Sequence, residues 1–131
     1  MPLALILLAV LPFWPSLAGD FIEDDRPIIR DRAELRAPSA IPSLFAQTYW
    51  PRDLPGGLYR PLTMTSYALD RVAWGADATG APSRVGIHAS NLILNALAVL
   101  LLFGILRERC GGRLSAFVAA ALFAVHPVHA E

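Results

Sequence analysis

The feature that most constrains this chain is a run of 20 residues without a charge, from Ile87 to Leu106. In an α-helix, with a rise of about 1.5 Å per residue, such a run crosses a hydrocarbon core of about 30 Å. Two more uncharged runs extend from Leu114 to Ala130 and from Met1 to Ala18. The three runs together predict an all-α membrane protein with about three transmembrane helices.

The charged residues lie mostly between the first two apolar runs. Residues 19–86 hold 8 of the 11 arginines and 9 of the 11 acidic residues. We therefore expect residues 1–18 to form a first membrane helix, residues 19–86 a large outer-face loop containing short helices, and residues 87–131 a membrane helical hairpin. The whole chain has 17% charged residues and a net charge of zero. Soluble domains carry about 25% charge, and a nucleic-acid binder needs a basic excess, so neither class is expected.

Residues 1–18 have a second interpretation. Ser16-Leu17-Ala18 resembles the small-residue cleavage site of a secretory signal, but the basic residues that precede such a signal are missing. Pro12 and Pro15 would end or kink a helix. A retained, incomplete membrane helix is favoured, whereas cleavage after Ala18 would indicate a small secreted or anchored protein with no enzyme role.

The connector Arg107–Arg113 sets the expected orientation. It carries three arginines and one acid beside two membrane segments, so the positive-inside rule places it in the cytoplasm. Long loops escape this rule, and residues 19–86 are then expected on the periplasmic side of a bacterial inner membrane. Because the chain stops at Glu131 beside that outer face, we expect an amino-terminal fragment of a larger polytopic protein.

An acidic motif, Glu23-Asp24-Asp25, follows the first apolar run. Carboxylates beside a low-dielectric boundary can act as a general base, which makes Asp24 and Asp25 candidate catalytic residues. The alternative is a solvated acidic cap that ends the helix. No cofactor is expected; the alternative is a divalent metal bound through oxygen ligands, although the motif does not specify the number of ligands that such a site needs.

Arg60 precedes a predicted helix. Pro61 fits the first position of a helix, and a guanidinium beside the free N–H groups of that helix end favours a phosphate or a carboxylate. The alternative is an ion pair between Arg60 and an acid of the loop.

Polar side chains also mark the two later apolar runs. His88, Asn91 and Asn95 share one face of the second run. They either line a wet cavity or hydrogen-bond to other helices; packing is favoured for Asn95, and His88 stays a candidate for substrate binding. After the third run come His126, His129 and Glu131. Pro127 disturbs the regular helix that metal ligation by the two histidines would need, so a polar substrate cleft is favoured over a metal site.

These motifs in this order resemble those of the transmembrane-and-tetratricopeptide-repeat O-mannosyltransferase-like proteins, which are in the C-type glycosyltransferase (GT-C) superfamily. The chain departs from that pattern at Asn95, where a second His is frequent, at Glu23, where an aromatic is frequent, and at Ala130, where Thr is usual. The matching residues are Asp24-Asp25, Tyr59-Arg60-Pro61-Leu62, His88 with Asn91, and Phe123–Glu131.

The resemblance implies a partial GT-C-type bundle and a transferase that moves a mannose-like sugar from a polyprenyl-phosphate donor to an acceptor hydroxyl of a protein or glycan. Asp24 or Asp25 would be the base, Arg60 would bind the lipid phosphate, and His126, His129 and Glu131 would line the cleft. Membrane lipid is a further expected partner, and nucleic acid is not. The alternative is a non-catalytic polytopic membrane module whose tetratricopeptide repeats lie outside this chain.

Overall fold

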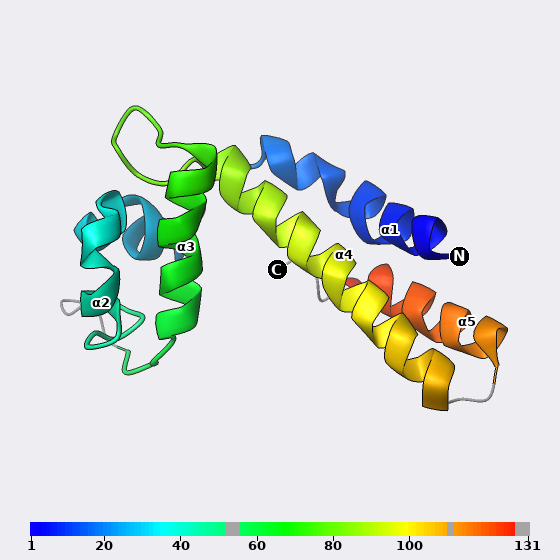
Figure 1. Cartoon of the computed structure of the whole chain (residues 1–131). Coiled ribbons are helices and arrows are strands. Elements are labelled where there is room, and N and C mark those ends of the chain that lie inside the picture. Colours follow the sequence, from blue (N-terminus) through cyan, green and yellow to red (C-terminus); the bar gives the residue numbers. More distant parts are fainter. Residues whose placement is uncertain (52–55, 110–111, 128–131) are drawn as a thin grey trace. The chain divides into compact units, whose positions relative to one another are not determined.

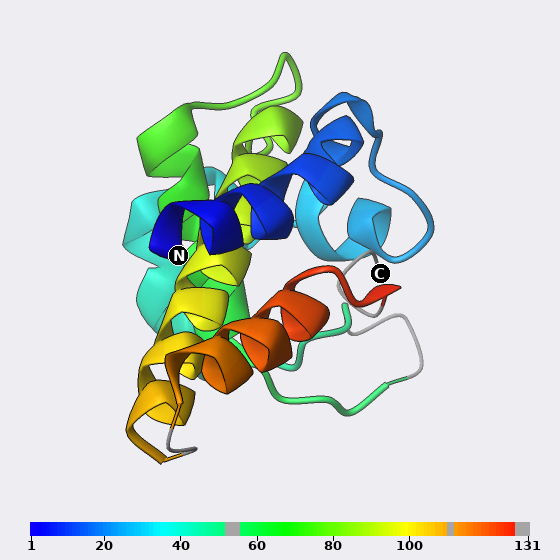
Figure 2. The same ribbon diagram turned by 90° about the vertical axis from the view of Figure 1, so that its right-hand side faces the viewer.

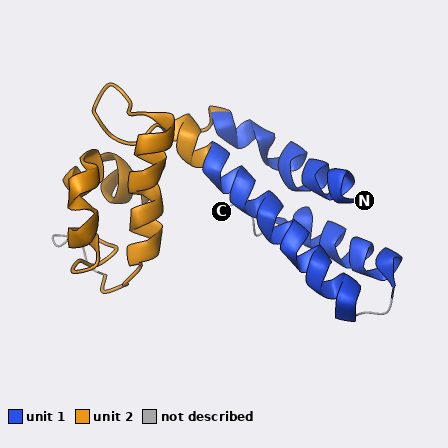
Figure 3. Ribbon diagram, in the orientation of Figure 1, with its two compact units in different colours: residues 1–17, 89–131 blue, residues 18–88 orange. Residues whose placement is uncertain are grey.

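The computed structural model describes residues 1–51, 56–109 and 112–127, and within these ranges the chain is helical and has no strand. It divides into two compact units, which Figure 3 shows in different colours. Unit 1 comprises Met1–Leu17 and Ala89–Glu131, and unit 2 comprises Ala18–His88. The all-helical part of the predicted fold class is therefore confirmed for the described residues.

Unit 1 is built from three helices around one apolar core. They are α1 (Pro2–Val10), the part of α4 (Arg84–Arg109) from Ala89 onward, and α5 (Arg113–Ala124). In Figures 1 and 2, α5 turns back beside the carboxy-terminal end of α4. Helices α1 and α5 contact each other directly, and small side chains at their contact allow the backbones to approach closely. The buried core residues are Leu5, Ala9, Val99, Phe103, Ala116, Ala120 and Ala124.

One of the three predicted membrane helices is long enough to cross a membrane. Among the described residues, α4 alone is long and apolar enough, with 26 residues and a mean hydropathy of 2.2 over its most apolar 18 residues. Helix α5 has 12 residues, or about 18 Å of helix. Helix α1 gives way at Leu11 to the 3₁₀ helix η1 (Leu11–Ala18), where two prolines interrupt the α-helical hydrogen bonds. Three transmembrane helices are therefore not confirmed.

Unit 2 consists of short helices packed against one longer helix. In chain order they are the π-helical turn η2 (Arg26–Arg30), the 3₁₀ helices η3 (Ala33–Arg36) and η4 (Pro38–Ala40), α2 (Ile41–Leu44), and α3 (Pro61–Trp74). Helix α3 packs against α2 and η3, and α2 lies beside it in Figure 1. The buried core residues are Phe21, Ile28, Ile29, Leu35, Leu44, Met64, Ala68 and Ile87.

Helix α3 begins where the sequence predicts and ends at a glycine. Pro61 occupies its first turn, as expected, and Gly75 follows its last residue with φ of 84°, a conformation that favours glycine. The loop to α4 is then organised by Asp77, whose Oδ1 accepts hydrogen bonds from the Thr79 N–H (2.7 Å) and hydroxyl (2.6 Å) and from the Ala81 N–H (3.1 Å). Burial acts to raise the pKa of Asp77, but these bonds outweigh it and hold the pKa below its ordinary value.

Candidate functional site in unit 2

The acidic motif lies on an unusual stretch of backbone. Glu23 has φ of 39°, in the left-handed region. Among the described residues, it is the one non-glycine residue with a positive φ. Directly after Asp25 comes the π-helical turn η2. Both conformations are rare and occur often at functional sites. Asp24 is exposed and Asp25 is half-buried, so the structure distinguishes two carboxylates that the sequence leaves equivalent.

Arg60 lies at the amino end of α3 with an exposed side chain. Its guanidinium carbon is 5.4 Å from the centre of the Tyr49 ring. Within the described ranges it forms no ion pair, so the alternative of an ion pair with a loop acid finds no support there. Pro61 has no N–H. The N–H groups of Leu62 and Thr63 belong to the first turn, where backbone N–H groups have no acceptors within the helix.

Two tyrosines connect Arg60 to the acidic motif. Burial raises the pKa of Tyr67, and the neighbouring Tyr49 phenol raises it further. The negative charge of Asp25 also raises the pKa of Tyr67, whereas the positive charge of Arg60 lowers it. Asp25 and Arg60 are far apart in the sequence, and the charge of each affects the pKa of this one half-buried phenol.

Sequence reasoning missed Tyr49 and Tyr67 as functional residues. Tyr67 fits the apolar pattern of α3, and its ring packs against the core of unit 2 together with that of Tyr49. A tyrosine in such a pattern indicates a core position. No local sequence signal distinguishes such a core tyrosine from a tyrosine whose pKa depends on charged residues of other segments.

His88 is half-buried in the first turns of α4 and belongs to unit 2. Its Nε2 atom is buried, and among the described residues it has no hydrogen-bond partner; the same is true of Oγ1 of Thr65 in α3. Because a buried polar atom without a partner is costly, His88 keeps its candidacy for contacting a substrate or another part of the protein.

The remaining predicted site residues lie elsewhere. His126 is exposed after the end of α5 and belongs to unit 1, so the predicted cleft shared with Asp24 and Asp25 stays a prediction. His129 and Glu131 lie outside the described residues. In the described part of the chain, no three His, Cys, Asp or Glu side chains are grouped so that they would hold a metal ion.

Asn95 has the packing role that its position favoured. Its Nδ2 donates a hydrogen bond to the Ala9 carbonyl of α1 at 3.0 Å. Pro12, three residues after Ala9, has no N–H with which a 3₁₀ turn would satisfy that carbonyl. The Asn95 amide therefore ties α4 to the backbone of α1 at a point where the chain changes from α-helix to 3₁₀ helix.

Curated proteins match nearly the whole chain, although no family model and no solved structure matches it. Protein O-mannosyl-transferase Tmtc1 of Drosophila melanogaster is 30% identical over 95% of this chain. Protein O-mannosyl-transferase TMTC4 of Homo sapiens is 31% identical over 94%, and TMTC1 of Mus musculus is 34% identical over 88%. The chain spans 14%, 18% and 12% of the lengths of these three relatives. The resemblance to the transmembrane-and-tetratricopeptide-repeat O-mannosyltransferases is therefore confirmed, and this chain is homologous to a short part of those proteins.

Proposed function

We propose that this chain is part of a membrane glycosyltransferase that moves a mannose-like sugar from a polyprenyl-phosphate donor to an acceptor hydroxyl of a protein or glycan. The relatives named protein O-mannosyl-transferases support the transfer of mannose. The observation that carries the proposed site is that unit 2 holds both the half-buried Asp25, directly before the π-helical turn η2, and the exposed Arg60 at the amino end of α3. A carboxylate base and a guanidinium for the phosphate are groups that this reaction needs.

The acidic pair supplies the base of the proposed step. The acceptor oxygen attacks the anomeric carbon, the bond from that carbon to the donor phosphate oxygen breaks, and the lipid phosphate leaves with the bonding electrons. A carboxylate of the pair takes the proton of the acceptor hydroxyl. Asp25 is the favoured base because it is half-buried, whereas Asp24 is exposed.

Arg60 stabilises the departing phosphate in this proposal. Negative charge develops on the phosphate as it leaves, and fixed donors aimed at that charge stabilise the transition state. The contact with the Tyr49 ring uses no conventional hydrogen bond, and the guanidinium donors can bind phosphate oxygens. The N–H groups at the start of α3 add a favourable partial charge.

The histidines and Glu131 complete the proposed cleft. His88, with its buried Nε2, is suited to bind the sugar or the acceptor. His126, His129 and Glu131 are proposed to line the same cleft after α5. No metal or other cofactor enters the proposed step.

The proposed location is a bacterial inner membrane, with unit 2 on its periplasmic side. Helix α4 has the length and hydropathy of a membrane helix. Unit 1 also exposes large apolar side chains on its three helices, a surface suited to lipid or to further helices. Examples are Leu3, Leu94, Leu101, Ile105, Leu114 and Leu122.

Replacing Arg60 by lysine in the full-length protein tests the donor site. Lysine keeps the charge and loses the guanidinium fork, so the KM for polyprenyl-phosphate mannose should rise by about tenfold or more, the value of a charged hydrogen bond. Transfer of labelled mannose to an acceptor in membrane vesicles measures it. Arg36→Lys, at an exposed arginine of the same unit, is the matched control. An unchanged KM in Arg60→Lys would remove Arg60 from the donor site.

A further inference from the structure

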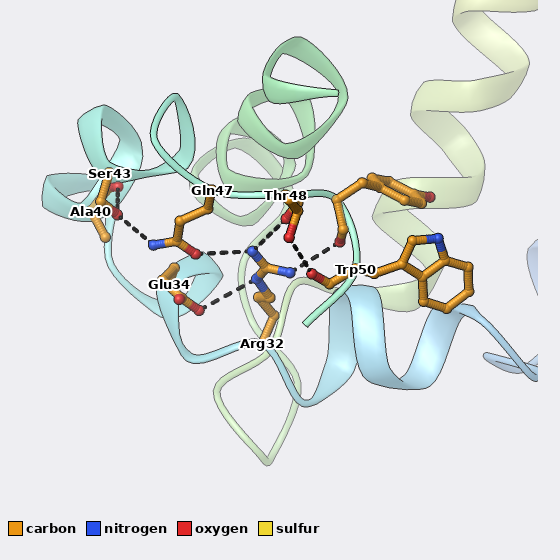
Figure 4. A network of polar contacts seen from close by, with 8 residues as sticks. Arg32, Glu34, Ala40, Ser43, Gln47, Thr48 and Trp50 are labelled. Atoms are coloured by element: carbon orange, nitrogen blue, oxygen red, sulfur yellow. Dashed lines mark hydrogen bonds and ion pairs between the residues drawn. The ribbon is translucent and has the colours of Figure 1, made fainter. Parts of the chain in front are cut away.

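Arg32 is the only polar or charged residue in the described ranges that is buried, with 6% of its surface exposed. Figure 4 shows its guanidinium surrounded by acceptors. Nη1 donates to the Tyr49 carbonyl at 3.0 Å, and Nη2 donates to the Thr48 carbonyl at 3.0 Å and to Oε1 of Gln47 at 2.9 Å. Nε lies 3.5 Å from the Glu34 carboxylate. A buried charge is retained at low cost only when its donors are satisfied in this way.

The segment that Arg32 holds is the one that supports Arg60. Tyr49 presents its ring to the Arg60 guanidinium at 5.4 Å. Its N–H donates to the Leu58 carbonyl at 2.6 Å, two residues before Arg60. The Trp50 ring packs edge-on against Tyr49, with 6.1 Å between ring centres. Fixing the Tyr49 backbone therefore fixes both the ring beneath Arg60 and the chain that leads into it.

We propose that Arg32 is a positioning residue for anion binding: through Tyr49 it holds the Arg60 guanidinium in the orientation that receives a phosphate. This inference rests on the proposed role of Arg60. The planar fork of Arg32 is what the arrangement requires, because three acceptors on consecutive residues must be reached at once. A lysine at this position presents its donors from a single nitrogen atom and loses that geometry.

A double-mutant cycle on the full-length protein tests the inference. The KM for polyprenyl-phosphate mannose is measured for Arg32→Lys, Arg60→Lys and the double variant, with Arg36→Lys as the control. If Arg32 acts through Arg60, each single variant raises this KM, and the double variant raises it no further than the more affected single variant, because the two sites are coupled. The Arg32→Lys effect should be about three- to tenfold, the size expected for a lost cation–π support, and it should fall on KM rather than on kcat.

Variants of Tyr49 provide a second test, which does not depend on whether the Arg32→Lys variant folds normally. Arg32 contacts Tyr49 through the backbone carbonyl, so Tyr49→Leu removes the ring beneath Arg60 and leaves the Arg32 hydrogen bonds in place. It should raise the donor KM as Arg32→Lys does, and Tyr49→Phe, which keeps the ring, should raise it less.

The outcomes separate this inference from the function on which it rests. A normal donor KM in Tyr49→Leu, or a full additive effect of Arg32→Lys on the Arg60→Lys background, would overturn the positioning role while the donor site stands. If Arg60→Lys itself leaves the donor KM unchanged, the proposed donor site fails and the positioning role fails with it.

Discussion

Tyr67 is a half-buried tyrosine of α3 with a pKa above its ordinary value. Burial, Tyr49 and Asp25 raise its pKa, and Arg60 opposes them. The folded state therefore favours the neutral phenol. This preference contributes to stability in full below the ordinary tyrosine pKa of about 10, and it is lost as the pH rises through the raised pKa of the folded state.

Two substitutions should move the Tyr67 titration in opposite directions. Asp25→Asn removes a negative charge and should lower the pKa of Tyr67, whereas Arg60→Ala removes a positive charge and should raise it further. A full alkaline titration of the tyrosinate absorbance measures this, and Tyr67→Phe identifies which part of the titration curve belongs to Tyr67. If neither substitution changes the signal, Asp25 and Arg60 do not share this phenol.

For single residues, the sequence motifs identified the charged candidate site residues but not the residues that contact them. Asp24, Asp25 and Arg60 stand in recognisable sequence patterns. Arg32, Tyr49 and Tyr67 belong to no such pattern, and their roles come from contacts between segments that are distant in the chain. Such contacts are set by tertiary packing, which no local pattern reports.

Among the elements, α1 depends on a side chain of another helix. Asn95→Leu would leave the Ala9 carbonyl without the Asn95 donor, and we expect a loss of about 0.5–1.5 kcal/mol in stability, typical of one hydrogen bond. The thermal midpoint of the protein in detergent measures this. Asn91→Leu, at an exposed position of the same helix, should change the midpoint less. Equal effects of the two substitutions would mean that the bond to Ala9 contributes nothing.

Local chemistry explains which elements the sequence predicts well. Helix α3 begins at Pro61 because proline suits a first turn, and the apolar run Ile87–Leu106 lies inside α4. The π-helical turn η2 and the left-handed Glu23 have no such signature. Ile28 and Ile29 of η2 are buried in the core of unit 2, and this burial depends on segments that are distant in the chain.

For the whole molecule, the apolar runs correctly predicted the helical class. The number of helices that cross the membrane stays a prediction. The expected topology can be checked with a membrane-impermeant thiol reagent on intact cells. In a Cys110→Ser background, Arg109→Cys should resist labelling because the arginine-rich connector is expected in the cytoplasm. Arg36→Cys, in the loop 19–86, should label readily. The reverse pattern would overturn the topology and with it the periplasmic location of the proposed site.

The central claim is that the acidic motif supplies the base of sugar transfer, and the rate of mannose transfer by Asp25→Asn tests it most directly. The measurement uses full-length protein that inserts to the normal level, with Asp24→Asn beside it and Asp31→Asn, at an exposed acid of the same unit, as the control. We predict that Asp25→Asn loses about 10²–10⁴-fold in rate, the usual contribution of a general base, while Asp31→Asn keeps its activity. Rates within about threefold of the unmodified protein for both Asp24→Asn and Asp25→Asn, far from that general-base contribution, would contradict the account.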